Sequence, residues 1–554
     1  LSFIDPDDWI SDNFYEELYN QTKGFIKPDI VKGSVYKSFE NDQSQEIVKT
    51  GYQNERIRKG LTQRKPLYLL FTYEHWSAIY HRRLFSKPDI CYGTSITAQD
   101  TTFLLRITSL TNRIKLAEKA AYYYRIRQGS ATTANIKRRS YGELDAFNEK
   151  IDSILNKRFT KYTYLYLKQH IMTLHNRFQE GLASGSIAHE ECIPYIKRMQ
   201  SCIKRVPNYT KIYKESIVIK NMMEHIELYE DSNNQPIRVS VILPVFNPGK
   251  EFNDCIQSLK SQMLGNIEFI FVDDCSQDES VDIIKKWMKE DPRVKLIQNT
   301  TNIGPGPSRN IGIEKAKGQY LSFIDPDDYI SNDFLELLYS VATQGKQEHK
   351  IAKGSCITVS LSKELDENTL QNKRILESLD TPIPLWRTFY YHHFTAIYHR
   401  SLFEDPSIRY GTTRASEDVV FSLKVGSITK DIVINNFSKY YYVQRETSLT
   451  HQSDDNRIDH LLQGLIAKKE ALDSYGDSSY VRDFFDTHLI YIYNALSSCL
   501  QNKDFNKKET LELLQRIKDT MQVLPHYHWH MERLPEFSVL FDEHLLFEKI
   551  DYKK

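Results

Sequence analysis

Short apolar runs alternate with segments of helical periodicity between residues 237 and 330. Val239 to Val245 is a continuous apolar run rich in β-branched residues, as expected of a strand buried on both faces, and Ile267 to Val272 repeats this pattern. Further strands are predicted over residues 294–297 and 319–324, and helices over residues 251–263, 278–289 and 307–317. Strict alternation of strand and helix predicts an α/β fold with a doubly wound, mostly parallel sheet.

Polar residues stand directly after the predicted strands. They are Asn247, Asp273, Asp274, Asn299, Asp325 and Asp327. In open α/β sheets ligands bind in the crevice at the carboxyl ends of the strands. We therefore expect these side chains to converge on one crevice, although they lie far apart in the sequence.

The chain contains a long internal repeat. Residues 1–11 (LSFIDPDDWIS) match residues 321–331 (LSFIDPDDYIS) at ten of eleven positions, and the match continues at an offset near 318, for example between AIYHRRLF at Ala78 and AIYHRSLF at Ala396. A repeat of about 320 residues indicates two complete domains in series rather than a solenoid. The first copy lacks a counterpart of residues 237–320, so we expect this sequence to be a fragment of a longer two-unit protein.

A charged, tyrosine-rich segment with helical patterning follows each copy of the repeat. The sequence therefore predicts the second half of a first catalytic-type domain, a helical appendage, a complete catalytic-type domain and a second helical appendage. The four predicted segments are residues 1–135, 136–235, 236–455 and 456–554.

Composition narrows the class of protein. Lys plus Arg and Asp plus Glu are equal at 73 each, which gives no reason to expect nucleic acid as a partner. The seven cysteines are scattered without a Cys-x-x-Cys pair, which argues against a zinc site or a disulfide framework. No apolar run approaches the ~20 residues that a membrane helix needs. We therefore expect a cytoplasmic protein, with peripheral attachment at the inner face of the cell membrane left open.

Asp325-Pro326-Asp327 is an Asp-x-Asp motif at the end of a predicted strand. Two carboxylates spaced in this way can hold a divalent cation, Mn²⁺ or Mg²⁺, and leave coordination positions for phosphate oxygens. Such a cation neutralises the charge that grows on a departing nucleoside diphosphate. A solvated turn is the alternative, but the duplication of the motif at Asp5-Pro6-Asp7 favours a metal site with Asp327, Asp325 and Asp7 as candidate ligands.

Two further strand ends carry candidate binding groups. Asp274 either caps the following helix or accepts a hydrogen bond from a base or ribose. Gly304-Pro305-Gly306 follows the third strand instead of the first, so it fails as a dinucleotide-binding fingerprint.

Glu417-Asp418 precedes an apolar run and is predicted to begin a helix. Acids at a helix start can simply favour the helix dipole, or one of them can act as a general base. The first copy has Gln99-Asp100 at this place, so the aspartate is the residue common to both copies and the better candidate. Arg445, matched by Arg127, is either a phosphate clamp or a surface arginine. His526, His528 and His530 have no counterparts in the first copy, which argues against a metal site there.

The second copy resembles the family-two inverting glycosyltransferases with the GT-A type nucleotide-diphospho-sugar fold. Five motifs carry the resemblance in this order: VSVILPVFN, FVDDCSQD, NIGPGPSRNIG, FIDPDD and the Glu417-Asp418 pair. They cover residues 237–450 fully and 1–132 in part. The duplicated layout also resembles bifunctional bacterial synthases of capsule or cell-envelope polysaccharides.

The resemblance implies a role for each matching position. The donor would be a UDP-sugar, and the acceptor an oligosaccharide, polysaccharide or lipid-linked glycan. Asp327 would bind the metal and Asp418 would deprotonate the acceptor hydroxyl, with Glu417 beside it and Asp100 as its counterpart. The remaining donor-binding candidates are Pro244, Phe246, Asp274, Arg309, Asp325, Asp328 and Arg445.

Three departures from the family pattern and two rival functions remain. Val443 replaces an arginine in the tyrosine strand, Ala396 replaces a lysine, and Phe246 replaces a tyrosine. A sugar-1-phosphate nucleotidyltransferase would need a Gly-rich, Arg-containing loop after the first strand, where this chain has Phe246-Asn247-Pro248-Gly249. A non-catalytic binding or scaffold module is the alternative, above all for residues 1–230.

Overall fold

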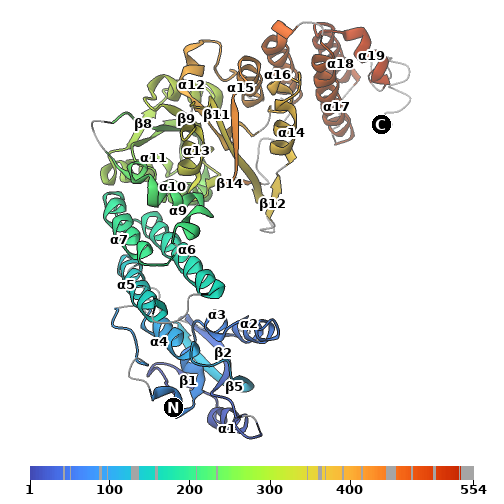
Figure 1. Ribbon diagram of the computed structural model, residues 1–554. Helices are drawn as coiled ribbons and strands as arrows, with labels where there is room; N and C mark the ends of the chain where they lie inside the picture. Colours follow the sequence, from blue (N-terminus) through green and yellow to red (C-terminus); the bar gives the residue numbers. More distant parts are fainter. Residues whose placement is uncertain are drawn as a thin grey trace. The chain divides into compact units, whose positions relative to one another are not determined.

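The computed structural model forms two compact units, Leu1–Ile226 and Glu227–Lys554 (Figure 1). It describes residues 1–25, 27–41, 44–49, 52–86, 90–95, 98–126, 136–155, 160–207, 209–231, 235–345, 347–359, 365–368, 370–389, 392–413, 416–444, 457–475, 478–502, 507–535 and 537.

The first half of unit 2 is a parallel sheet flanked by helices (Figure 1). Strand β6 (Val239–Val245) pairs in parallel with β7 (Ile267–Asp273) and with β9 (Tyr320–Phe323), and β7 pairs in parallel with β8 (Val294–Gln298). The connecting helices are α10 (Phe252–Lys260), α11 (Ser280–Glu290) and α12 (Pro305–Lys315). These elements confirm the predicted α/β class.

Two helix boundaries differ from the predicted ones for local reasons. Helix α12 begins at Pro305, two residues earlier than expected, because Gly304 takes a positive φ of 90° and leaves proline at the first helical position. Helix α10 ends at Lys260, three residues earlier than expected. The Gln262 side chain there donates one hydrogen bond to the Ser258 carbonyl and another to the Ser331 carbonyl, each at 2.9 Å.

The second half of the sheet is mixed. Its strands are β10 (Tyr329–Ile330), β11 (Ile351–Val359), β12 (Leu365–Asn368), β13 (Ala396–His399) and β14 (Ile432–Val443). Strand β13 runs antiparallel to both β9 and β11, β11 and β14 are parallel, and β10 is antiparallel to β14. The predicted parallel order therefore holds for only one half of the sheet. The helices of this half are α13 (Phe334–Thr343), α14 (Leu370–Leu379) and α15 (Glu417–Ile428).

An aromatic core supports the end of β9, where the candidate acids begin. Phe323 is fully buried, and its ring centroid lies 5.0 Å from that of Tyr410 and 5.5 Å from that of Phe421. Tyr410 and Phe421 stack on each other at 4.3 Å. Since Phe421 belongs to α15, this aromatic packing holds α15 close to the end of β9, which Asp325 follows.

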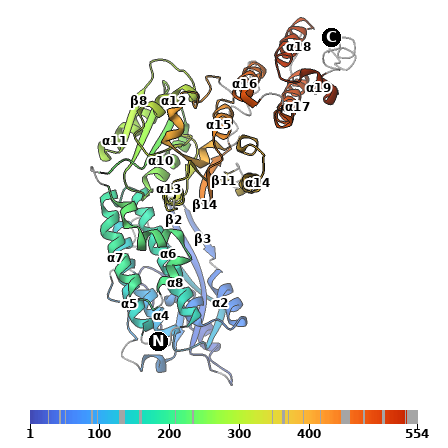
Figure 2. The ribbon, with the colours of Figure 1, turned by 45° about the horizontal axis from the view of Figure 1, so that its top comes forward.

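Further helices follow the sheet of unit 2 in the described part of the chain (Figure 2). They are α16 (Arg457–Leu472), α17 (Ser479–Asn502), α18 (Lys507–Gln522) and α19 (Tyr527–Arg533). Leu465 of α16 and Phe484 of α17 share one buried cluster with Trp386 and with Val419 and Leu423 of α15. The appended helices therefore pack on the same helix that carries the candidate general base.

Unit 1 contains a five-stranded sheet with the pairing found in the second half of the sheet of unit 2. Its strands are β1 (Trp9–Ile10), β2 (Ile30–Asn41), β3 (Ser44–Lys49), β4 (Ala78–Tyr80) and β5 (Ile114–Ile126). Strands β2 and β5 are parallel with a register shift between Gly33 and Ser34, and β11 and β14 show the same shift between Lys353 and Ser355. Its first helices are α1 (Phe14–Asn20), α2 (Tyr52–Thr62), α3 (Leu67–Leu70) and α4 (Gln99–Thr108).

Five more helices complete unit 1. They are α5 (Ile136–Leu155), α6 (Lys161–Ala183), α7 (Cys192–Lys204), α8 (Tyr209–Lys214) and α9 (Ile217–Glu224).

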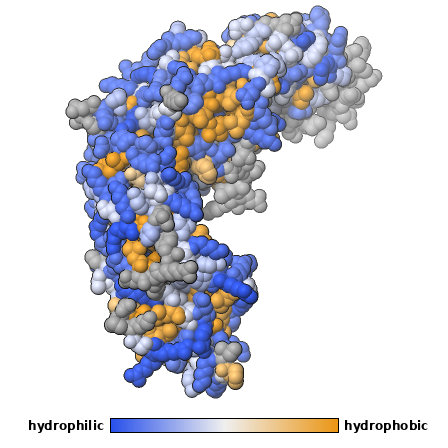
Figure 3. Space-filling view, viewed as in Figure 1, coloured by the Kyte–Doolittle hydropathy of each residue, from blue (hydrophilic) through white to orange (hydrophobic). Residues whose placement is uncertain are grey.

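The visible surface is mostly hydrophilic, with apolar residues gathered over the region of β11 and β14 in unit 2 (Figure 3). No helix in the described part of the chain is long and apolar enough to cross a membrane.

Candidate functional site

A tight turn after β9 carries the three acids of the FIDPDD motif. The amide of Asp328 donates to the carbonyl of Asp325 at 3.1 Å, which closes the turn. The Asp325 and Asp327 side chains are partly exposed, whereas Asp328 is only 1% exposed. The turn therefore presents the first two carboxylates at the sheet edge and buries the third.

Tyr440 of β14 holds this turn in place. Its hydroxyl donates to Oδ2 of Asp328 at 2.8 Å and accepts from the amide of Asp325 at 3.1 Å. The amide of Val443 donates to Oδ1 of Asp328 at 2.8 Å. Burial and the nearby charge of Asp325 raise the pKa of Asp328 well above its usual range. Asp328, predicted to bind the donor, thus has both carboxylate oxygens engaged within the protein.

Arg309 of α12 joins two of the predicted site residues. Its guanidinium donates to Oδ1 of Asp325 at 2.6 Å and to Oε1 of Glu417 at 3.1 Å, and its carbon centre lies 5.0 Å from the ring centroid of Tyr410. Arg309 is only 4% exposed, and the nearby carboxylates raise its pKa further against the effect of burial. A buried arginine between two carboxylates brings segments more than a hundred residues apart into one site.

Glu417 and Asp418 begin α15, as the sequence predicts. Burial and the charge of Asp418 raise the pKa of Glu417 to about 7, although Arg309 acts in the opposite direction. Burial also raises the pKa of Asp418, whose Oδ2 lies 4.0 Å from Nδ1 of His393. Burial, with Arg309 nearby, lowers the pKa of His393 well below its usual range, so this imidazole is neutral at physiological pH. Among the described residues, no lysine or arginine forms an ion pair with Asp418.

Asp274 organises the loop before α12. Its Oδ1 accepts from the side-chain amide of Asn299 at 2.8 Å and from the amide of Ile303 at 2.9 Å, and its Oδ2 accepts from the amide of Gly304 at 2.7 Å. The carboxylate therefore fixes the start of the helix that carries Arg309. Pro244 is buried within β6, whereas Phe246 just beyond the strand is 51% exposed and can offer its ring to a flat ligand.

The carboxylates of the turn fit a divalent cation only in part. Arg309 occupies one oxygen of Asp325, and both oxygens of Asp328 have partners within the protein. Asp327 lies partly exposed on the same turn. Among the described residues no group of three His, Cys, Asp or Glu side chains is arranged to hold a metal ion. One or two carboxylates together with substrate phosphates suffice for Mg²⁺, which matches this donor set.

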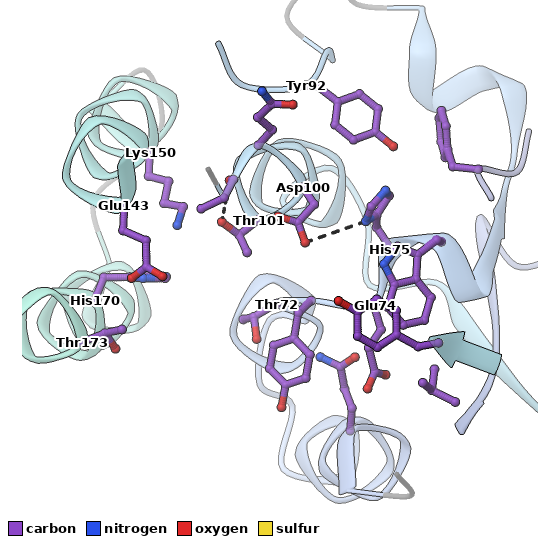
Figure 4. A pocket seen from close by; sticks show the side chains of 18 of the residues that line it. Thr72, Glu74, His75, Tyr92, Asp100, Thr101, Glu143, Lys150, His170 and Thr173 are labelled. Carbon is purple, nitrogen blue, oxygen red and sulfur yellow. Dashed lines mark hydrogen bonds and ion pairs between the residues drawn. The ribbon is translucent and has the colours of Figure 1, made fainter. Parts of the chain in front are cut away.

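Unit 1 repeats much of this arrangement. Tyr122 donates to Asp8 at 2.8 Å and accepts from the amide of Asp5 at 3.2 Å, as Tyr440 does with its two aspartates. Oδ2 of Asp100 lies 4.0 Å from Nδ1 of His75, the same spacing as between Asp418 and His393. Asp5 and Asp100 line a cavity of 1580 Å³, part of which Figure 4 shows; Asp7 lies on the adjoining turn.

Other predicted residues lie outside this site or outside the described residues. Arg445 and Arg127 belong to the parts of the chain that the structure does not describe. His530 is buried, with its Nδ1 2.6 Å from Oδ1 of Asp486 and its Nε2 3.0 Å from the carbonyl of Pro525, so it serves helix packing.

The roles of Tyr440 and of the Arg309–Glu417 pair were not predicted from the sequence. The repeated tyrosine runs at residues 122–124 and 440–442 were the available signal for the first. For the Arg309–Glu417 pair the sequence offered only a weak indication. Unit 1 has Gln99 in place of Glu417, and the given sequence of unit 1 includes no position that matches Arg309.

Comparison with known proteins finds a family match over part of unit 2. The family model "Glycosyl transferase family 2" matches residues 240–405. An uncharacterized glycosyltransferase of Haemophilus influenzae is 41% identical over 145 residues, which cover 25% of this chain and 58% of that protein. The poly(ribitol-phosphate) beta-glucosyltransferase of Bacillus spizizenii is 30% identical over 221 residues, or 38% of this chain and 33% of that protein.

The chain thus spans between a third and three fifths of the length of these two relatives. Among solved structures, residues 1–349 of S. aureus TarS with UDP-GlcNAc align with 55% of this chain and 90% of that one, at 20% identity and a TM-score of 0.40. The family match over residues 240–405 covers β6 to β13, including the FIDPDD turn and Arg309. Residues 240–405 of this chain are therefore similar to the family 2 glycosyltransferases.

Proposed function

We propose that unit 2 transfers a sugar from a nucleoside diphosphate donor, with UDP as the expected nucleotide, to a hydroxyl of a carbohydrate acceptor. The observation that carries this proposal is the Arg309 bridge, which joins Asp325 at the sheet edge to Glu417, the neighbour of Asp418. Donor-side and acceptor-side carboxylates therefore belong to one site. The Bacillus spizizenii relative is named for glucosyl transfer to poly(ribitol-phosphate), which supports an acceptor in the cell envelope.

The proposed reaction is a single in-line displacement with inversion. Asp418 accepts the proton of the acceptor hydroxyl, and the oxygen attacks the anomeric carbon on the side opposite the diphosphate. The bond from that carbon to the diphosphate breaks, and its electron pair leaves with the diphosphate. The raised pKa of Asp418 suits this task, because a carboxylate of higher pKa is a stronger base.

On the donor side, the turn and α12 supply the binding groups. Phe246 would stack on the nucleobase, Asp325 and Arg309 would face the ribose and phosphates, and Asp327 would hold Mn²⁺ or Mg²⁺. The cation would neutralise the charge of the departing diphosphate. Asp274 supports this side indirectly, since it fixes the loop that leads into α12.

The test is UDP release from a panel of UDP-sugars in the presence of Mn²⁺ and carbohydrate acceptors. Asp327→Ala and Asp418→Asn should each lower turnover by about 10²- to 10⁴-fold, because one removes the metal ligand and the other the general base. Asp282→Asn on the exposed face of α11 is the matched control and should keep full turnover. Full turnover in both site variants would refute the assigned roles.

A second function fits unit 1, where Asp100 lines a cavity of 1580 Å³. This unit would act as a binding module for the acceptor chain. Calorimetry with UDP, with and without Mn²⁺, separates the two roles, because only a donor site shows metal-linked affinity for UDP. We further propose a location in the cytoplasm or at the inner face of the cell membrane.

A further inference from the structure

Two buried lysines occupy equivalent places in the appended helices of the two units. Lys150 of α5 and Lys468 of α16 are 318 positions apart, the offset of the repeat, and they are 4% and 5% exposed. Lysine is almost never buried to this extent unless it is paired. Neither ammonium group has a hydrogen-bonding or ion-pair partner among the described residues. Each is therefore a buried cation without a protein anion in contact.

In unit 1 the lysine lines the cavity that holds the candidate base. Lys150 extends from α5 toward Asp100 and Thr101 at the start of α4, with Glu143 and His170 beside it (Figure 4). The volume of 1580 Å³ exceeds the roughly 300–1,000 Å³ of sites for drug-sized ligands. It can hold several sugar residues, of which one would lie between the lysine and the aspartate.

The other cations on the helical wall of this cavity are already paired. Nε of Arg139 lies 3.3 Å from Oε1 of Glu143, and Nε of Arg177 lies 3.6 Å from the same oxygen. Among the described residues of α5 and α6 that line the cavity, Lys150 is therefore the lysine or arginine without an ion pair. Burial lowers its pKa to about 8, against the charges of Glu143 and Asp100, so it stays mainly protonated at neutral pH.

In unit 2 the equivalent appended helix packs on the helix that carries the candidate base. Helix α16 packs against α15, which begins with Glu417 and Asp418. Burial lowers the pKa of Lys468 to about 8, against the charge of Asp418, and Lys468 in turn lowers the pKa of that carboxyl. The two groups are thus close enough to interact without forming an ion pair.

We propose that the appended helices complete the acceptor site, with Lys150 and Lys468 each binding an anionic group of the acceptor beside the aspartate. The inference rests on the proposed function and names its acceptor class: a glycan whose sugars or linkers carry phosphate or carboxylate groups. An anionic oxygen on the acceptor would form the ion pair that the lysine ammonium group lacks among the described residues. It would also anchor the acceptor so that one hydroxyl faces the carboxylate.

Binding of three probes with the same ring tests this site in the full chain without any nucleotide sugar. Glucose 6-phosphate represents a phosphate, glucuronic acid a carboxylate, and glucose the uncharged reference, all titrated at one ionic strength. At least one anionic probe should bind about 10- to 100-fold more tightly than glucose, as expected of a charge-assisted hydrogen bond. The tighter of the two anionic probes identifies the acceptor's charged group.

Substitution of the lysines provides the decisive comparison. Lys150→Met and Lys468→Met should each remove one of two binding sites, and the double variant should bind all three probes equally. Methionine is similar in length to lysine and removes the buried charge, so the melting temperature should stay equal or rise. Lys150→Arg should retain part of the preference, and Lys197→Met on the exposed face of α7 should retain all of it.

Two results would overturn the inference. One is equal binding of glucose and of both anionic probes by the unmodified chain; the other is an unchanged anion preference in the double variant. Loss of UDP release with anion binding intact would refute the catalytic proposal instead, so the two failures are distinguishable.

Discussion

The pair formed by Arg309 and Glu417 predicts a specific pH dependence of stability. Glu417 is buried, and its pKa is raised to about 7 by burial and by Asp418, from an ordinary value of 4.5. Its carboxyl therefore keeps its proton to a higher pH in the folded chain than in the unfolded chain. The associated stability is fully present below pH 4.5 and is lost as the pH rises to about 7.

The size of the effect follows from the same shift. Each pKa unit corresponds to about 1.4 kcal/mol, so the free energy of unfolding should fall by at most about 3 kcal/mol over this interval. Glu417→Gln removes the titration but keeps an oxygen that can accept from Arg309, and unit 1 already has Gln99 at this position. The variant should therefore fold and lose only this part of the pH dependence.

Urea unfolding followed by tryptophan fluorescence provides the assay; Trp386, which is buried beside α15, is one of the five tryptophans that contribute to the signal. With a slope of roughly 3 kcal/mol per molar, the unmodified chain should lose up to about 1 M in midpoint between pH 5 and pH 8 relative to Glu417→Gln. Glu314→Gln, an exposed position on α12, should behave as the unmodified chain.

Parallel midpoints of the unmodified chain and Glu417→Gln across this pH range would contradict the expected titration of Glu417. Such a result would mean that Glu417 titrates as it does in the unfolded chain, and that Arg309 fully offsets the cost of its burial.

Three further predictions concern the surroundings of the site. Burial lowers the pKa of Lys353 to about 7, so the chain should gain stability as the pH rises above 7. His392→Glu should supply the ion pair that unit 1 has here and reduce this gain in urea unfolding; the gain should not vanish, because burial lowers the pKa of the paired Lys32 as well. Tyr440→Phe should lower stability by about 1–3 kcal/mol in the same assay, because Asp328 loses a hydrogen bond in a buried place. Ser416 has a left-handed φ of 68°, so Ser416→Gly should raise the melting temperature or leave it unchanged while UDP release falls.

The first half of the sheet in unit 2 could be predicted from the sequence because its signals are local. A strand buried on both faces reads as a continuous apolar run, so β6 has the predicted bounds of Val239 and Val245. The ends of these apolar runs also show where the acids stand relative to the strands. The start of α15 at Glu417 could be predicted because an apolar run follows it in the sequence. The family resemblance added the roles, which local patterns do not contain.

The mixed half of the sheet could not be predicted in this way. Strand β13 pairs with β9 and β11 on its two sides, although residues 320 and 399 are far apart in the sequence, and such pairing leaves no local mark. The contact of Arg309 with Glu417 spans 108 positions and depends on how α12 and α15 pack on the sheet. Hydrophobic periodicity identifies the buried face of each helix, but it does not identify which polar groups meet across the crevice.

Backbone geometry links the two units more closely than side-chain identity does. Glu74 and His392 both take a left-handed φ, of 66° and 58°, and Ala98 and Ser416 take 59° and 68° just before the helices of the candidate bases. None of the four is glycine, so each such conformation costs free energy that the surrounding structure must offset. The residues differ in charge and size between the units, yet the strained positions are the same. In both units the candidate base lies at the same distance from a histidine: Oδ2 of the aspartate is 4.0 Å from Nδ1 of the histidine. The two copies of the repeat therefore share this placement.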